Sequence, residues 1–390
     1  MYDVILTCNY SPWSSYRGGG QKSTHMVASA LAGMGKRVCV VYSKGPFERV
    51  PLPADLPYDV KWAFFFAVKP GISSPLRFLN GITFYFKVRT LTGPETVLHG
   101  NGDEASLLGY IPDKKKFVYS HRYPGFDSFM FRTRWGTWKT RLSVFFREPR
   151  FTAFALGLRG ADAVTCTSLS SAQQLHACFQ VPETKIHIVP NGIDPAFLEV
   201  GFPDAAARGI VYYGRMTRAK GVDTLLWAYA GLPAETRAAH PLTLIGDGPY
   251  AAELRALAEQ LGITAARWIP WLDSAELARE IRGHRLAALP SREESFGNTM
   301  LETLATGQAL VTTSAGSIPE VVGKDGEWAE LVPPDDVDAL RAAILRSLSG
   351  SSTMAPHDPQ RAAARREYVR ARFSWESTAK AFVKLYDRGP

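Results

Sequence analysis

Short apolar runs alternate with longer amphipathic stretches along nearly all of this 390-residue chain. A short apolar run followed by apolar residues at helical spacing indicates a strand that leads into a helix, and repetition of the pair predicts parallel βαβ units. We therefore expect an α/β fold with two doubly wound sheets, each covered by its own helices. The expected strands are 4–8, 38–42, 96–99, 117–120, 163–166 and 186–189 in one set, and 210–213, 242–245, 266–269, 286–289, 309–312 and 329–332 in the other.

The length of the chain exceeds what a single core supports, so two or three domains are expected. Pro195, Gly201 and Pro203 break any regular element between the two sets of strands, so we expect the boundary between Asp194 and Arg208, and we set it at residues 198/199. No apolar run approaches the ~20 residues needed to span a bilayer. The start has no basic leader, and a cytoplasmic protein is expected. The four cysteines lack metal-like spacing, and we expect buried thiols.

The positive charge lies in the first half of the chain. Residues 1–198 hold 23 Lys and Arg against 13 Asp and Glu, a net charge of +10, whereas the remainder has a net charge of −2. This asymmetry indicates an anionic partner for the first half. No nucleic-acid-binding motif accompanies the charge, so no nucleic acid is expected as a partner.

The most informative segment is Ser291-Arg-Glu-Glu-Ser-Phe-Gly-Asn-Thr-Met-Leu-Glu302, which follows an expected strand and leads into a helix. A helix N-terminus at the carboxyl end of a parallel strand suits a phosphate. Glu294 and Glu302 flank that position, and ionised carboxylates accept hydrogen bonds from sugar hydroxyls. The segment therefore predicts a ligand with a hexose, a diphosphate and a ribose in line. The alternative is that Thr299 and Glu302 form a capping box and that Glu302 is only a helix cap.

This segment resembles the Glu-x7-Glu signature of retaining glycosyltransferases of family 4, and the match continues through Ala305-Thr-Gly307 and Gly316-Ser-Ile-Pro-Glu320. The resemblance implies the GT-B fold, in which two doubly wound Rossmann-like domains face a central cleft. It also implies that Glu294 contacts the donor sugar and Glu302 the ribose. Ser295, Phe296, Gly297 and Asn298 are assigned to the donor site with them.

A second motif, Gly214-Arg-Met-Thr-Arg-Ala-Lys220-Gly, follows another expected strand and precedes a helix. A lysine in front of a helix N-terminus is disfavoured by the helix dipole unless an anion lies there. Lys220 and Arg215 together suit a diphosphate, whose charge grows as it leaves. The alternative is two solvated charges on a turn. The order Gly-Arg-x4-Lys-Gly resembles the phosphate clamp of the family, which implies that role here.

Three further segments resemble donor-site loops of the family. Gly18, Gly19 and Gly20 precede a helix, where glycines let N–H groups approach a phosphate, although a flexible turn fits as well. Gly246-Asp-Gly-Pro249 is similar to a loop that admits the nucleotide, and a plain turn is equally compatible. The resemblance implies that the nucleobase lies near the segment that holds Ile269. The family often has a glycine where this chain has Pro270, and proline lacks an N–H donor, so the resemblance does not imply which base is bound.

His121 directly follows the expected strand 117–120, at a strand end where ligands collect. The alternative is a histidine that binds a neighbouring loop. The resemblance implies that His121 contacts the donor sugar near the reacting carbon. The family has an Asp after this histidine, whereas this chain has Arg122. His99, on another strand-end loop, is the second candidate.

Residues 61–89 and 129–150 mix aromatic and basic side chains, a composition that suits an anionic membrane surface. The alternative is an ordinary helix face with its aromatic residues in a core.

The resemblance implies a hexosyltransferase that moves a sugar from a nucleotide-diphosphate-sugar to a glycolipid, oligosaccharide or polysaccharide with retention of configuration. It also implies an acceptor-binding domain, which we expect at 1–198, a donor-binding domain at 199–372, and a C-terminal helix at about 373–390 that packs back on the first domain. Neither a metal nor a cofactor is expected, and the protein is expected in the cytoplasm, peripheral at the inner face of the membrane. A catalytically silent nucleotide-sugar-binding scaffold and a nucleotide-dependent oxidoreductase are the alternatives, the latter without a dinucleotide fingerprint. The expected catalytic residues are His121, Arg215, Lys220 and Glu294.

Overall fold

The computed structural model describes residues 1–14, 19–45, 49–64, 76–122, 149–204, 206–323, 326–350 and 358–388. The chain divides into two compact units, and each contains one parallel sheet. The first unit is Met1–Gly192 with Trp375–Pro390, and the second is Ile193–Ser374. The division therefore falls at Gly192/Ile193, before the expected 198/199. The reason is a short helix, α7 (Pro195–Glu199), which buries Phe197 in the core of the second unit.

The first unit has a seven-stranded parallel sheet in the order β3-β2-β1-β4-β5-β6-β7. The order reverses between β1 and β4, which is the topological switch point of a doubly wound sheet. The strands are β1 (Val4–Cys8), β2 (Val38–Lys44), β3 (Asp59–Phe64), β4 (Val97–Gly100), β5 (Lys116–Ser120), β6 (Ala163–Cys166) and β7 (Ile186–Ile188). The helices are α1 (Gly19–Gly33), α2 (Leu76–Arg89), α5 (Pro149–Gly160), α6 (Leu169–Phe179) and α16 (Trp375–Asp387), with short turns η1 (Asp103–Ala105), η2 (Leu108–Tyr110) and η3 (Glu183–Lys185).

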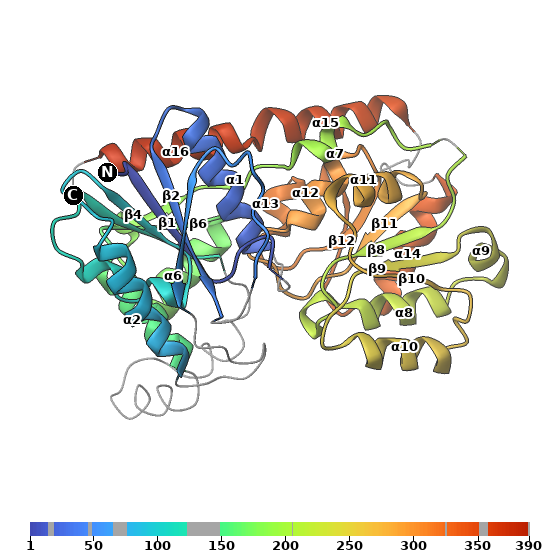
Figure 1. Cartoon of the computed structure of the whole chain (residues 1–390). Helices are drawn as coiled ribbons and strands as arrows, with labels where there is room; N and C mark the ends of the chain where they lie inside the picture. Colours follow the sequence, from blue (N-terminus) through green and yellow to red (C-terminus); the bar gives the residue numbers. More distant parts are fainter. Residues whose placement is uncertain are drawn as a thin grey trace. The chain divides into compact units, whose positions relative to one another are not determined.

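Both faces of this sheet are buried. Ile5 of β1 packs with residues of α2 and α5, whereas Val4 and Leu6 pack with α1 and α16. Figure 1 shows α16, the last helix, lying beside α1 in this unit. Continuous apolar runs such as Val4–Cys8 are the expected consequence of a strand covered on both sides.

Polar contacts anchor α16 to the first sheet. His99 of β4 hydrogen-bonds the Tyr386 hydroxyl at 2.6 Å, and Lys116 of β5 donates to the carbonyl oxygens of Leu385 (3.0 Å) and Arg388 (2.9 Å). Carbonyl groups at a helix C-terminus lack partners within the helix, so the Lys116 ammonium completes the end of α16.

The second unit has a six-stranded parallel sheet in the order β10-β9-β8-β11-β12-β13. Its strands are β8 (Ile210–Tyr213), β9 (Leu242–Ile245), β10 (Arg267–Ile269), β11 (Leu286–Leu289), β12 (Leu310–Thr313) and β13 (Glu330–Val332). Helices α8 (Val222–Ala230), α9 (Ala234–Ala239), α10 (Ala251–Gln260), α11 (Ser274–Arg282), α12 (Asn298–Ala305), α13 (Ile318–Val322), α14 (Val337–Ser349) and α15 (Pro359–Arg372) accompany it, with a short turn η4 (Arg218–Lys220).

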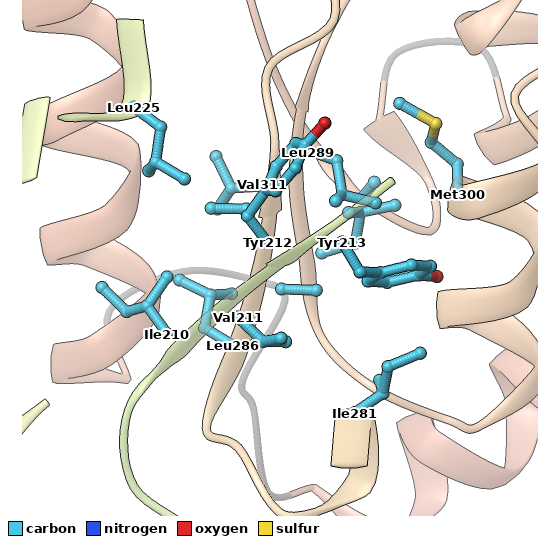
Figure 2. Close-up of a cluster of buried hydrophobic side chains, with 14 of the residues drawn as sticks. Ile210, Val211, Tyr212, Tyr213, Leu225, Ile281, Leu286, Leu289, Met300 and Val311 are labelled. Carbon is cyan, nitrogen blue, oxygen red and sulfur yellow. The ribbon is translucent and has the colours of Figure 1, made fainter. Parts of the chain in front are cut away.

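Apolar side chains fill both faces of the second sheet. Figure 2 shows Leu225 of α8 on one side of the central strands and Met300 of α12 on the other. Tyr212 and Tyr213 are adjacent on β8, so they point to opposite faces. Both are almost fully buried, although each carries a hydroxyl that needs a partner.

The strand β3 was not predicted from the sequence. It overlaps the start of residues 61–89, where aromatic and basic residues suggested a membrane surface. Its residues pair with β2 at the edge of the first sheet, and residues 76–89 form α2, in which Phe84 and Val88 are fully buried. The described part of this stretch is thus a strand and a helix of the first unit. Residues 65–75 and 123–148, including most of 129–150, lie outside the described residues.

The cysteine prediction is confirmed, because Cys8, Cys39, Cys166 and Cys178 are all buried and unbridged. Within the part of the chain that the structure describes, no helix has both the length and the apolar character needed to cross a membrane.

Candidate active site

The two motifs that the sequence singled out meet at the switch point of the second sheet. The segment that contains Arg215 and Lys220 follows β8, and the segment that contains Glu294 follows β11. These two strands are neighbours at the place where the strand order reverses. Ligands of open α/β sheets bind outside the carboxyl ends of the strands at this position.

Lys220 and Glu294 form a partly buried ion pair between these segments. The Lys220 ammonium donates a hydrogen bond to Oε1 of Glu294, and only 7% of the Glu294 side chain is exposed. The Ser291 hydroxyl donates to the same oxygen at 3.1 Å. The backbone carbonyl of Glu294 accepts hydrogen bonds from the N–H and the hydroxyl of Ser317, at 3.2 and 3.1 Å. The carboxylate is therefore fixed in position and its charge is compensated.

A close approach of the backbones holds the two segments together. Gly221 has φ +64°, and a Cβ at this residue would lie 2.0 Å from the carbonyl oxygen of Pro290. The positive φ and the steric overlap each disfavour a side chain here, so the contact requires a glycine at position 221. On the other side of the contact, the carbonyl oxygen of Ala219 accepts the N–H groups of Arg292 (2.8 Å) and Glu293 (3.3 Å).

Arg215 presents a free cation on the same segment. Its side chain is exposed and makes no hydrogen bond or ion pair with any residue of the described ranges. Its carbonyl oxygen accepts the Tyr212 hydroxyl at 3.1 Å. Burial, followed by the nearby Glu294 carboxylate, raises the pKa of Tyr212 far above its usual value. Tyr212 therefore stays protonated and keeps donating this hydrogen bond.

The other tyrosine of β8 holds α12, the helix that carries Glu302. The Tyr213 hydroxyl donates to the carbonyl oxygen of Thr299 and lies 2.9 Å from the Thr303 hydroxyl. Burial, followed by the negative charge of Glu302, raises the pKa of Tyr213 well above its ordinary value. Sequence reasoning missed both tyrosines as site residues, because they look like ordinary members of an apolar strand.

The capping-box alternative for Glu302 is wrong. Helix α12 begins at Asn298, its N-cap is Gly297 in a left-handed conformation, and no side chain caps it. Glu302 lies more than one turn inside the helix, so it cannot reach the N-cap N–H. Its carboxylate is half-buried, and the contact of Glu302 with a ribose stays a prediction.

The residues between the two glutamates divide into two kinds. The Phe296 ring is buried and packs edge-on against Phe373, with ring centroids 5.9 Å apart, so its side chain belongs to the core. Gly297 is also buried and has φ +90°. Ser295 and Asn298 are half-buried. Together with Thr299, which is also half-buried, they present polar side chains near the start of α12.

Gly246 and Ile269 come together at the neighbouring strand ends. The Gly246 N–H donates to the carbonyl oxygen of Ile269 at 2.9 Å. Gly246 has φ +124°, and a Cβ there would lie 2.1 Å from the carbonyl oxygen of Gly214. The glycine is thus required by a backbone contact within the unit. Beyond Ile269, Pro270 and Trp271 are exposed.

The predicted residues of the first unit lie at its own strand ends. His121 follows β5 and is almost fully buried, and burial lowers the pKa of its imidazole to about 4, so the ring is neutral at pH 7. Burial lowers the pKa of Arg122 to about 10. Gly19 and Gly20 open helix α1 and are exposed, whereas Gly18 lies outside the described residues. The contact of His121 with a donor sugar stays a prediction. His99 is a core residue, since its second ring nitrogen binds the Ser120 hydroxyl at 2.6 Å.

A buried acidic pair beside β4 was also missed. Asp103 and Glu104 are 3% and 1% exposed, and the Asn9 amide donates to Asp103 at 2.5 Å. Burial, followed by the charge of Asp103, raises the pKa of Glu104 to about 8. The sequence places both residues in a polar loop and gives no local signal that the loop is buried. Across the described ranges, no three His, Cys, Asp or Glu side chains form a group that could hold a metal ion.

Two family models cover most of the chain. Residues 17–197 match the model described as Glycosyltransferase Family 4, and residues 207–350 match the model described as Glycosyl transferases group 1. The chain therefore belongs to the glycosyltransferases that these two models together describe. The division between the two matches lies close to the division between the two compact units.

Among curated relatives of the family, an MMP alpha-(1→4)-mannosyltransferase from Mycolicibacterium hassiacum is 33% identical over 226 residues, which are 57% of this chain and 53% of that protein. The chain spans about half the length of the curated relatives it matches. Among solved structures, sucrose-phosphate synthase from Thermosynechococcus elongatus superposes with a TM-score of 0.76 at 21% identity, over 98% of each chain. HepE from Anabaena, solved with UDP and glucose, gives a TM-score of 0.71 at 18% identity over 99% of each chain. These likenesses show the GT-B fold.

Proposed function

We propose that this protein is a retaining glycosyltransferase whose second unit binds a nucleoside-diphosphate sugar at the ends of β8 and β11. The observation that carries the proposal is the Lys220–Glu294 pair, which places a cation and a carboxylate together at the switch point. A sugar diphosphate presents hydroxyl groups next to negative charge. A carboxylate that accepts hydroxyl hydrogen bonds and a cation that binds phosphate match those two parts.

In this proposal the donor's diphosphate lies against Lys220, Arg215 and the N-terminus of α12. Arg215 is exposed and has no protein partner among the described residues, so its charge is available to an anion. Glu294 binds hydroxyls of the donor sugar and Glu302 binds the ribose. A relative named as a mannosyltransferase and a structural neighbour solved with UDP and glucose support a donor of this class.

The reaction transfers the sugar to a hydroxyl of the acceptor. The bond between the anomeric carbon and the diphosphate oxygen breaks, and its electron pair leaves with the diphosphate. The acceptor oxygen forms its bond from the same face, and its proton passes to the departing phosphate oxygen. Arg215, Lys220 and the helix terminus stabilise the growing negative charge, so the proposal requires no metal ion or other cofactor.

We place the acceptor in the first unit and propose a glycolipid or an oligosaccharide. The net charge of +10 in residues 1–198 supports an acceptor that carries an anionic group. Salt dependence of the acceptor's KM, with an unchanged donor KM, would support this placement, because screening weakens only exposed charge attraction.

The test is a thermal-shift screen against UDP-, GDP- and ADP-sugars, followed by a transfer assay with the donor that raises Tm. The anomeric configuration of the product, read by NMR, tests retention. Binding without turnover toward any oligosaccharide or glycolipid acceptor would favour a catalytically silent scaffold, and an inverted product would overturn the proposed stereochemistry.

A further inference from the structure

Arg292 lies in the loop that carries Glu294 (residues 290–297, the β11 loop), and every nitrogen of its guanidinium donates a hydrogen bond. Its two Nη atoms donate to the two carboxylate oxygens of Asp223, at 2.8 and 2.9 Å. Nη2 also donates to the Thr224 hydroxyl at 3.0 Å, and Nη1 to the carbonyl oxygen of Arg218. Nε donates to Asp335. One side chain of the β11 loop is thus bonded to Arg218 in the loop after β8 (residues 214–221, the β8 loop) and to the first turn of α8, which follows that loop.

The burial and charges around Arg292 hold its guanidinium in one orientation. Its side chain is 24% exposed and that of Asp223 is 23% exposed, so the bidentate pair is sheltered from water. Hydrogen bonds to Asp223 are the main cause that raises the pKa of Arg292 above its already high value. A parallel two-bond contact of this kind fixes orientation as well as distance.

The backbone of Asp335 provides a second, independent observation. This residue has φ +61°, a left-handed conformation that non-glycine residues seldom adopt. Aspartate tolerates it better than most, and here its carboxylate accepts the Nε–H of Arg292. Glycine would adopt this backbone conformation with less strain. The backbone alone therefore favours glycine at position 335, whereas the ion pair with Arg292 requires the aspartate.

We propose that Arg292 is a positioning residue for the donor site, which sets the spacing between Lys220 and Glu294 without touching the donor itself. The inference rests on the proposed function of that site. The guanidinium fixes the loop at Arg218 and at Asp223, on either side of Lys220, while Ala219 accepts the N–H groups of Arg292 and Glu293. A lysine at 292 would keep the charge but lose the planar fork that reaches these partners together.

The test compares purified Arg292→Gln and Arg292→Lys with wild type and with a matched control, Arg346→Gln. Arg346 of α14 donates through Nε and Nη2 to Glu330 of β13, at 2.8 and 2.5 Å, so both members of the pair belong to elements outside the two loops. We expect both Arg292 variants to weaken binding of the nucleoside diphosphate and to lower kcat, by about 10- to 100-fold together, because loss of alignment is costly in catalysis. The control should stay within about 2-fold of wild type, because Arg346 lies on α14 and its side chain is 52% exposed.

A second variant separates an effect on nucleotide binding from an effect on protein stability. Asp335→Gly removes the outer partner of Arg292 and relaxes the backbone, so its Tm should equal or exceed that of wild type. Its affinity for the nucleoside diphosphate should still fall by about 2- to 5-fold, the range of a partly exposed ion pair. Lower affinity at an undiminished Tm separates positioning from a general loss of stability.

Lys220→Ala serves as the reference that separates the two proposals. If Lys220→Ala loses nucleotide binding while folded Arg292→Gln binds and turns over like Arg346→Gln, the positioning role of Arg292 is overturned and the donor site stands. If Lys220→Ala also binds the nucleotide like wild type, the donor site itself is misplaced. The positioning role further requires Arg292→Gln and Asp223→Asn to be non-additive in a double-variant cycle, since they remove one shared contact.

Discussion

The ammonium of Lys220 and the carboxylate of Glu294 are hydrogen-bonded to each other in a partly buried pair, across the two loops that end β8 and β11. Each group thereby compensates the charge of the other. A bound diphosphate would compete with Glu294 for the Lys220 ammonium. The carboxylate would then be available to hydroxyl groups, which are the groups that a donor sugar brings.

The two cations of the β8 loop should contribute differently to stability and to catalysis. Arg215→Ala removes an exposed charge, so we expect the free energy of unfolding to change by less than about 0.5 kcal/mol. Its kcat should fall by a factor that corresponds to about 3 kcal/mol, the usual effect of losing one group that stabilises a leaving anion. Arg218→Ala is the matched control, because Arg218 is an exposed arginine of the same loop that pairs with Glu253 at 3.0 Å. Equal rates for the two variants would contradict a role for Arg215.

Lys220→Ala should lose activity to a similar extent but should also destabilise the second unit. The substitution leaves the carboxylate of Glu294, whose side chain is 7% exposed, without its cation. An unpaired buried charge costs at least about 1–3 kcal/mol. Chemical denaturation measures this cost, and a variant as stable as wild type would show that the ion pair is not maintained in solution.

Glu302→Gln should raise the donor's KM and leave stability unchanged. Glu302 is not a helix cap, because α12 begins at Asn298 with Gly297 as its N-cap. The glutamine amide retains the shape of the side chain. Because it is neutral, it accepts weaker hydrogen bonds from ribose hydroxyls than the ionised carboxylate does. Glu259→Gln, on the exposed face of α10, is the control. A donor KM equal to that of the control would exclude contact between Glu302 and the donor.

A pH dependence is expected from Glu104, whose pKa is raised to about 8 by burial. Its unfolded value is about 4.5, so between pH 4.5 and 8 the folded state holds a proton that the unfolded state releases. Stability that depends on this proton is present below pH 4.5 and is lost as pH rises to 8. Glu104→Gln cannot titrate, so its stability relative to wild type should increase across that window, by at most about 1.4 kcal/mol per pH unit. A constant difference between the two proteins from pH 4.5 to 8 would contradict the raised pKa.

Most strands of the two sheets could be predicted from the sequence, because buried parallel strands are continuous apolar runs. The expected strands 163–166, 210–213, 242–245 and 286–289 agree with β6, β8, β9 and β11 to the residue. The strand β3 escaped prediction for the opposite reason. It is an edge strand in which Asp59 and Lys61 alternate with apolar residues, and only Ala63 is fully buried. A charged edge strand and an exposed amphipathic segment have the same local pattern.

The candidate site was predictable only where a motif is contiguous in sequence. Glu294, Lys220 and Arg215 could be named because their motifs resemble those of a family. Arg292 could not, because its partners Asp223 and Asp335 are distant in sequence and only the fold brings them together. Similarly, the role of Tyr213 depends on its position beside α12, which no local pattern specifies.

The most direct test of the donor site is a calorimetric titration of wild type, Lys220→Ala and Glu294→Gln with UDP, GDP and ADP. We predict that at least one diphosphate binds wild type and that Lys220→Ala binds it about 10-fold more weakly, a loss of about 1.4 kcal/mol. Glu294→Gln should bind it at least as tightly as wild type, because Lys220 no longer has a competing carboxylate, yet it should fail to transfer sugar. If none of the diphosphates binds, or if Lys220→Ala binds as wild type does, the assignment of the donor site to the ends of β8 and β11 is contradicted.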